Sequence, residues 1–107
     1  IFFEPPASPL LERHFGKGPH MFGKRVLGLP GDKVSHHGAD VLINGRRVAV
    51  RLAHTRLGLA LTPGPEGEIP RGCYYVGSDH PRGFDSRYAE VGFACRGQIL
   101  GSGRAIL

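Results

Sequence analysis

Glycine and proline interrupt this chain so often that long helices are excluded from most of it. The 107 residues include 17 glycines and 9 prolines, about twice the combined share of roughly 12% in average proteins. Both residues are unfavourable inside helices and common in turns. With 40% hydrophobic residues, the chain can form one small core. We therefore predict a single domain over residues 1–107, mostly β, with short strands joined by turns and few short helical turns.

Turn signals set the boundaries of the predicted strands. Asn44-Gly45 stands between apolar runs within residues 40–50, which is the strongest short-range signal for a β-hairpin. Pro30-Gly31-Asp32 is a turn signature that ends a strand predicted over residues 21–29. Further short strands are expected over residues 1–3, 33–37, 73–76 and 98–107.

The segments between these strands read as connections. Residues 5–20 mix proline, glycine and charge, with one or two helical turns possible from Ser8. Residues 62–70 are rich in turn formers and are expected to be an exposed excursion. Residues 78–90 form a polar loop. The apolar runs are far shorter than the ~18 to 20 residues that span a bilayer, so any membrane anchor is expected outside this segment.

Charge and metal-binding patterns favour neither nucleic acid nor a cofactor. The net charge is +5, but the basic residues are scattered and do not alternate with aromatic ones as in a stacking platform. No CxxC pair is present, and among six histidines only His36 and His37 are adjacent, where a strand would point them to opposite faces. We expect no metal, no cofactor and no nucleic-acid partner.

The two cysteines lie symmetrically about the polar loop. The midpoint between Cys73 and Cys95 is residue 84, so a regular hairpin would place them opposite each other. A disulfide would need a modest adjustment of such a pair. A disulfide and two buried thiols are both consistent with this spacing.

Lys24 is the first candidate for chemistry. In a strand, Phe22 and Val26 would share its face, and an apolar wall could lower the pKa of the lysine by disfavouring its ammonium. A neutral amine could then accept a proton from a serine hydroxyl. The alternative is a surface lysine at a sheet edge.

The polar loop holds the second set of candidates. Asp85 and Arg87 are close enough in sequence to form a buried ion pair that fixes the loop, and Asp79 and Ser86 could also turn inward. The alternative is a solvated turn in which Asp85 caps its own backbone.

The two segments together resemble the conserved boxes of the type I signal peptidases. Residues 24–32, KRVLGLPGD, are similar to the lysine box, and Asp79 with residues 85–88, DSRY, is similar to the later GDN…DSRY box. Phe84 before Asp85 looks more like the TraF-type peptidases of conjugative transfer. The resemblance extends over roughly residues 21–107.

The resemblance implies a signal-peptidase-like domain of antiparallel β-sheets or a partly open barrel. It also implies that the protein is a membrane-associated serine-lysine endopeptidase. Lys24 would be the general base, and Asp85 would act with it, supported by Arg25, Asp79, Ser86 and Arg87. The substrate would be an exported precursor, a pilin in the conjugative members, processed at the periplasmic face of the inner membrane. The acyl-enzyme would be resolved by water or by the pilin's own amino terminus, which would close a ring.

The chain departs from the family pattern at two points. The family's nucleophilic serine lies in an S-x-M-x-P-like segment well before the lysine, and none of Ser8, Ser35, Ser86 and Ser102 has that setting. We therefore expect the anchor and nucleophile upstream of Ile1, and residues 1–107 alone to be inactive. In addition, Gly83 stands where the family commonly has a serine that binds the lysine. Asp85, Ser86 or water would have to substitute.

Two other functions remain open. One is a general signal peptidase that removes leader peptides. The other is a non-catalytic β-domain. It would be either a basic module that binds nucleic acid or an acidic protein partner and is retained on a DNA column in a salt-dependent manner, or a structural domain that kept the fold after losing the active serine.

Overall fold

The fold consists of small antiparallel sheets joined by turns, as predicted. The structure is a computed structural model and describes residues 1–18 and 20–101. Within these residues there are three sheets, one short α-helix and no closed barrel. No helix in this part of the chain has the length and apolar character needed to cross a membrane.

The first sheet joins the two ends of the described chain. It has the strand order β10-β1-β2, with bounds β1 (Phe2–Phe3), β2 (Phe22–Gly23) and β10 (Ile99–Gly101). Between β1 and β2 lies α1 (Pro9–Phe15), which Ser8 caps by accepting a hydrogen bond from the backbone N of Leu11 at 3.1 Å. The predicted helical turns are thus confirmed.

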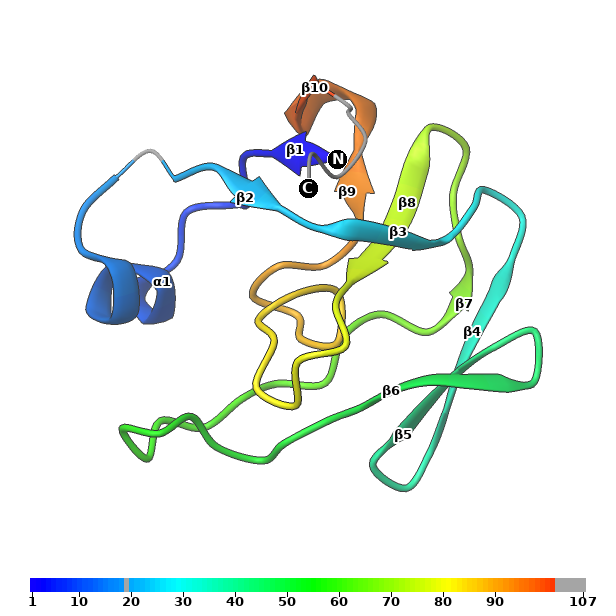
Figure 1. The fold of residues 1–107 in the computed structure, drawn as a ribbon, viewed down its shortest axis with the longest axis horizontal. Helices are drawn as coiled ribbons and strands as arrows, with labels where there is room; N and C mark the ends of the chain where they lie inside the picture. Colours follow the sequence, from blue (N-terminus) through cyan, green and yellow to red (C-terminus); the bar gives the residue numbers. More distant parts are fainter. Residues whose placement is uncertain (19, 102–107) are drawn as a thin grey trace.

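The second sheet, β3-β8-β9, crosses the middle of the molecule (Figure 1). Its strands are β3 (Arg25–Gly28), β8 (Cys73–Gly77) and β9 (Ala94–Cys95), and a short 3₁₀ helix, η1 (Arg96–Gln98), follows β9. Tyr75 and Val76, adjacent on β8, are both fully buried, and they belong to two different core clusters. Strand β8 therefore lies between two small cores.

The third sheet contains the predicted hairpin and has the order β6-β5-β4-β7. Its strands are β4 (Lys33–His37), β5 (Asp40–Ile43), β6 (Arg46–Val50) and β7 (Gly67–Glu68). Asn44 and Gly45 both have positive φ, 52° and 82°, as a two-residue hairpin turn requires. The hairpin and the strand over residues 33–37 are confirmed.

The strand predicted over residues 21–29 is instead two strands, β2 and β3, separated at Lys24. Strand β2 pairs with β1, whereas β3 pairs with β8, so the chain changes sheets at this lysine. The turn that follows β3 is present, since the backbone N of Asp32 donates to Leu29 O at 3.0 Å.

Residues 62–70 are not simply an exposed excursion. Strand β7 pairs with β4, Ile69 is 1% exposed, and Gly64 N donates to Arg87 O at 2.8 Å. In Figure 1 this segment, in green, runs back past the polar loop drawn in yellow. The segment therefore holds the loop that carries the second candidate motif.

The cysteines form a disulfide between β8 and β9. Cys73 and Cys95 are register partners and are joined by an S–S bond. The final strand predicted over residues 98–107 begins at Ile99; residues 102–107 lie outside the described part of the chain.

Candidate active site

Lys24 lies at the point where the chain passes between two sheets. Its backbone N donates to Ile1 O at 2.9 Å, which fixes the main chain there. Its side chain is half-buried, and Nζ lies 5.7 Å from the centre of the Phe22 ring, within the range of a cation–π contact. Phe22 and Val26 both pack against the core cluster around Val76, and of these two predicted wall residues Phe22 contacts the Lys24 amine.

Burial lowers the pKa of Lys24 from its ordinary value of 10.5, because loss of water disfavours the ammonium. Two charges in the polar loop modify this effect. The carboxylate of Asp85 raises the lysine pKa, and the guanidinium of Arg87 lowers it. The lysine thus lies within electrostatic reach of both loop residues, and its amine loses its proton more readily than in water.

Asp85 and Arg87 form the buried ion pair that the sequence suggested, not a solvated turn. Asp85 is 0% exposed and Arg87 3%. The guanidinium donates to both carboxylate oxygens, from Nε to Oδ1 at 2.9 Å and from Nη2 to Oδ2 at 2.8 Å. Burial by itself lowers the pKa of Arg87, but its hydrogen bond and charge interaction with Asp85 raise it.

The guanidinium of Arg87 also joins the loop to distant segments. It donates to Val50 O at 3.2 Å and to His80 O at 3.0 Å. Because these carbonyls belong to β6 and to the beginning of the loop, the ion pair fixes the position of the loop relative to both.

Ser86 has a structural role, because both hydrogen bonds of its hydroxyl are to backbone groups. Its Oγ accepts a hydrogen bond from Val76 N at 2.9 Å and donates to Gly92 O at 2.7 Å. The side chain is fully buried. These bonds fasten the loop to β8 and use both the donor and an acceptor site of the hydroxyl.

Arg25 and Asp79 meet at the surface. Their side chains are joined by an ion pair of 3.2 Å but are 68% and 87% exposed. This pair connects the residue after Lys24 to the start of the polar loop. An exposed pair of this kind stabilises a fold only slightly.

Among the residues that the structure describes, the histidines His14, His54 and His80 line the cavity described below, and no serine does. Ser8 caps α1 and Ser35 is exposed on β4, while Ser102 lies outside the described residues. His36 Nδ1 lies 3.1 Å from Glu66 Oε1, and burial lowers the pKa of this histidine. Among residues 1–18 and 20–101, no group of three potential metal ligands is found.

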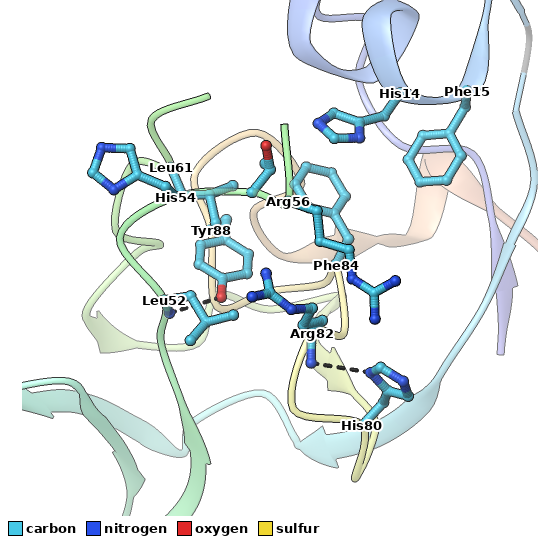
Figure 2. A pocket seen from close by; sticks show the side chains of 11 residues that line it. His14, Phe15, Leu52, His54, Arg56, Leu61, His80, Arg82, Phe84 and Tyr88 are labelled. Carbon is cyan, nitrogen blue, oxygen red and sulfur yellow. Dashed lines mark hydrogen bonds between the residues drawn. The ribbon is translucent and has the colours of Figure 1, made fainter. Parts of the chain in front are cut away.

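A cavity of about 360 Å³ is lined in part by residues of the polar loop. Figure 2 shows its walls: His14 and Phe15 of α1, the segment containing Leu52 and Arg56, and loop residues around Phe84. Phe22 packs edge-to-face against Phe84 at a centroid distance of 6.3 Å. Phe22 therefore contacts both Lys24 and a ring that lines the cavity, whose walls are basic and aromatic.

Sequence reasoning missed the tight packing beneath the loop. A Cβ added to Gly64 would clash with the carbonyl oxygen of Ser86, and one added to Gly77 would lie 3.4 Å from Asp85 Oδ2 and 2.7 Å from Leu27 Cδ1. Tyr88, which accepts a hydrogen bond from Leu52 N at 2.9 Å, was also missed.

Comparison with known proteins identifies one family. The family described as "Signal peptidase, peptidase S26" matches residues 1–107. No curated protein matches the chain, and no solved structure matches it.

Proposed function

Because this chain belongs to the signal peptidase family, peptidase S26, we propose that Lys24 is the general base of an endopeptidase that processes exported precursor proteins. Members of this family are serine-lysine peptidases that act on precursors. The observation that carries the assignment of Lys24 is its half-buried amine, whose pKa is lowered by loss of water, beside the buried Asp85–Arg87 pair.

In the proposed reaction, the neutral Lys24 amine accepts the proton of a serine hydroxyl as the oxygen attacks the scissile carbonyl. The lysine then returns the proton to the leaving amine, and an acyl-enzyme remains. Water, activated by the same amine, releases the acyl group. Asp85 and Arg87 hold the loop next to the lysine and balance its charge.

The nucleophile is proposed to be a serine that the gene encodes upstream of Ile1. Ser8 is engaged as a helix cap, and the hydroxyl of Ser86 is bonded on both sides. By the same proposal the upstream segment carries the membrane anchor, and the site faces the periplasm. Residues 1–107 by themselves would then be inactive.

The finer specificity is proposed from the motif at residues 78–88, SDHPRGFDSRY. This motif resembles that of the TraF-type peptidases, which supports a pilin precursor as the substrate. Mass spectrometry distinguishes the two outcomes, because a pilin closed into a ring is lighter by one water than the hydrolysed product. A general signal peptidase would instead cleave leader peptides from unrelated secreted proteins.

The central experiment uses the chain extended by the residues its gene encodes upstream. Lys24→Met should abolish cleavage of the precursor, with a loss of at least about 10³-fold, because the base is removed. Lys33→Met, at an exposed lysine of β4, is the matched control and should retain activity. An active Lys24→Met protein would overturn the proposal.

A second candidate function is the binding of an acidic partner. It is favoured by the cavity in Figure 2, whose lining includes Arg56 and Arg82 and no carboxylate. This function predicts salt-dependent retention of the chain on an anionic column, and loss of that retention in the Arg56→Gln/Arg82→Gln variant. Equal retention of both proteins would remove it.

A further inference from the structure

Gly83 has no side chain, and the side chains of other residues occupy the space where its Cβ would lie. A Cβ added there would clash with Arg87 Nη2 and would lie 2.7 Å from Ser78 Oγ and 2.9 Å from Asp85 Oδ2. The Ser78 hydroxyl therefore lies in the space that a residue-83 side chain would enter, next to the buried ion pair.

The loop groups expected to replace a serine at position 83 are already occupied. Asp85 accepts three hydrogen bonds from Arg87, two from the guanidinium and one from the backbone N at 3.0 Å. Ser86 is bonded to Val76 N and Gly92 O. Oδ1 of Asp85 accepts two of the bonds from Arg87 and Oδ2 accepts one, so most of the acceptor capacity of the carboxylate is used, and Asp85 acts on the lysine through its charge.

The register of β3 and β8 bears on how Ser78 lies relative to the lysine. Strands β3 and β8 are antiparallel, and their last partners are Arg25 and Gly77. If this register continues by one residue beyond each strand, it pairs Lys24 with Ser78. The Ser78 hydroxyl is half-buried, and it accepts only a long hydrogen bond of 3.4 Å from His80 N, so its capacity for another bond is largely unused.

We propose that Ser78 is a positioning residue for Lys24 and supplies from the end of β8 the hydroxyl that Gly83 cannot. Its oxygen accepts one N–H of the lysine amine when the side chain leaves the Phe22 ring. That bond orients the lone pair of the neutral amine nitrogen toward the nucleophilic serine. This inference rests on the proposed function of Lys24.

The test compares two isosteric variants in the chain extended upstream. Ser78→Thr keeps the hydroxyl, whereas Ser78→Val replaces it with a methyl group of the same shape. We expect kcat of the valine variant to be about tenfold lower at unchanged KM, which is the loss of one ordinary hydrogen bond. Ser35→Val, at an exposed site on β4, should leave kcat unchanged.

A second measurement is independent of turnover. The Lys24 amine is titrated by NMR in both variants, and we expect a midpoint about half a pKa unit lower with valine, because an acceptor favours the charged amine. Equal kcat values and equal midpoints would overturn the role of Ser78. An active Lys24→Met protein would instead overturn the proposed function, and the NMR comparison would still decide whether Ser78 binds the amine.

Discussion

The pKa of Lys24 depends on three influences, which are its partial burial, the carboxylate of Asp85 and the guanidinium of Arg87. Its pKa in the folded chain is lowered by burial, whereas the unfolded chain retains the ordinary value of 10.5. Between these two values the unfolded state binds the additional proton. The free energy of unfolding should therefore rise with pH across that interval.

This dependence can be measured by urea unfolding at a series of pH values. Lys24→Met should remove the rise below pH 10.5, and the exposed Lys33→Met should retain it. In the extended, active chain, kcat/KM should rise with pH through the same lowered midpoint, since only the neutral amine accepts a proton. An activity limb near 10.5 would contradict a buried base.

Arg87 is the counter-ion of a carboxylate that has no access to water. Arg87→Met should lower the free energy of unfolding by about 3 to 5 kcal/mol, because it leaves Asp85 buried and uncompensated. Arg25→Met, which breaks the exposed pair with Asp79, should lower it by less than about 1 kcal/mol. Similar losses in chemical denaturation would show that burial of the pair does not matter.

Strand β8 lies between the two cores and leads into the polar loop. A disulfide attaches this strand to β9. The disulfide between Cys73 and Cys95 closes a loop that contains the whole of residues 78–90. Replacing both cysteines by alanine should lower the free energy of unfolding by about 3 kcal/mol through the entropy of the unfolded chain. Thermal denaturation of the oxidised, reduced and substituted proteins provides the measurement. If the reduced and oxidised proteins melt together, the bond has no such role.

At the scale of the whole molecule, the segment over residues 51–70 packs against the polar loop that carries Asp85 and Arg87. Gly64 packs so closely on the loop that a Cβ would clash with the Ser86 carbonyl oxygen. Gly64→Ala should lower the free energy of unfolding by about 1 to 3 kcal/mol and shift the NMR signals of the Arg87 guanidinium. Gly97→Ala is the control, because nothing lies within 4 Å of its added Cβ. A stable Gly64→Ala protein with unchanged Arg87 signals would disprove this contact.

The local sequence was sufficient to predict the turns and several of the strands. The Asn44-Gly45 hairpin, the turn at Pro30 and the strand over residues 33–37 agree with the structure, because positive φ and restricted φ are properties of those residues themselves. The family was also readable from two motifs, and the match over residues 1–107 agrees with it.

Contacts between distant segments determined the rest. The alternation of residues 21–29 continues through Lys24, so only the exchange of β1 for β8 as the pairing partner reveals the break there. The spacing of the cysteines was consistent with both two thiols and a disulfide. The register of β8 and β9 places them opposite each other, where they are joined. Polar residues 85–87 are buried, and distant segments contact them: Gly64 N donates to Arg87 O, Ser86 Oγ is bonded to Val76 N, and Arg87 donates to Val50 O. Burial lowers the pKa of Lys24 and determines the free-energy cost of placing a charged group in the interior. It depends on those long-range contacts and not on local sequence.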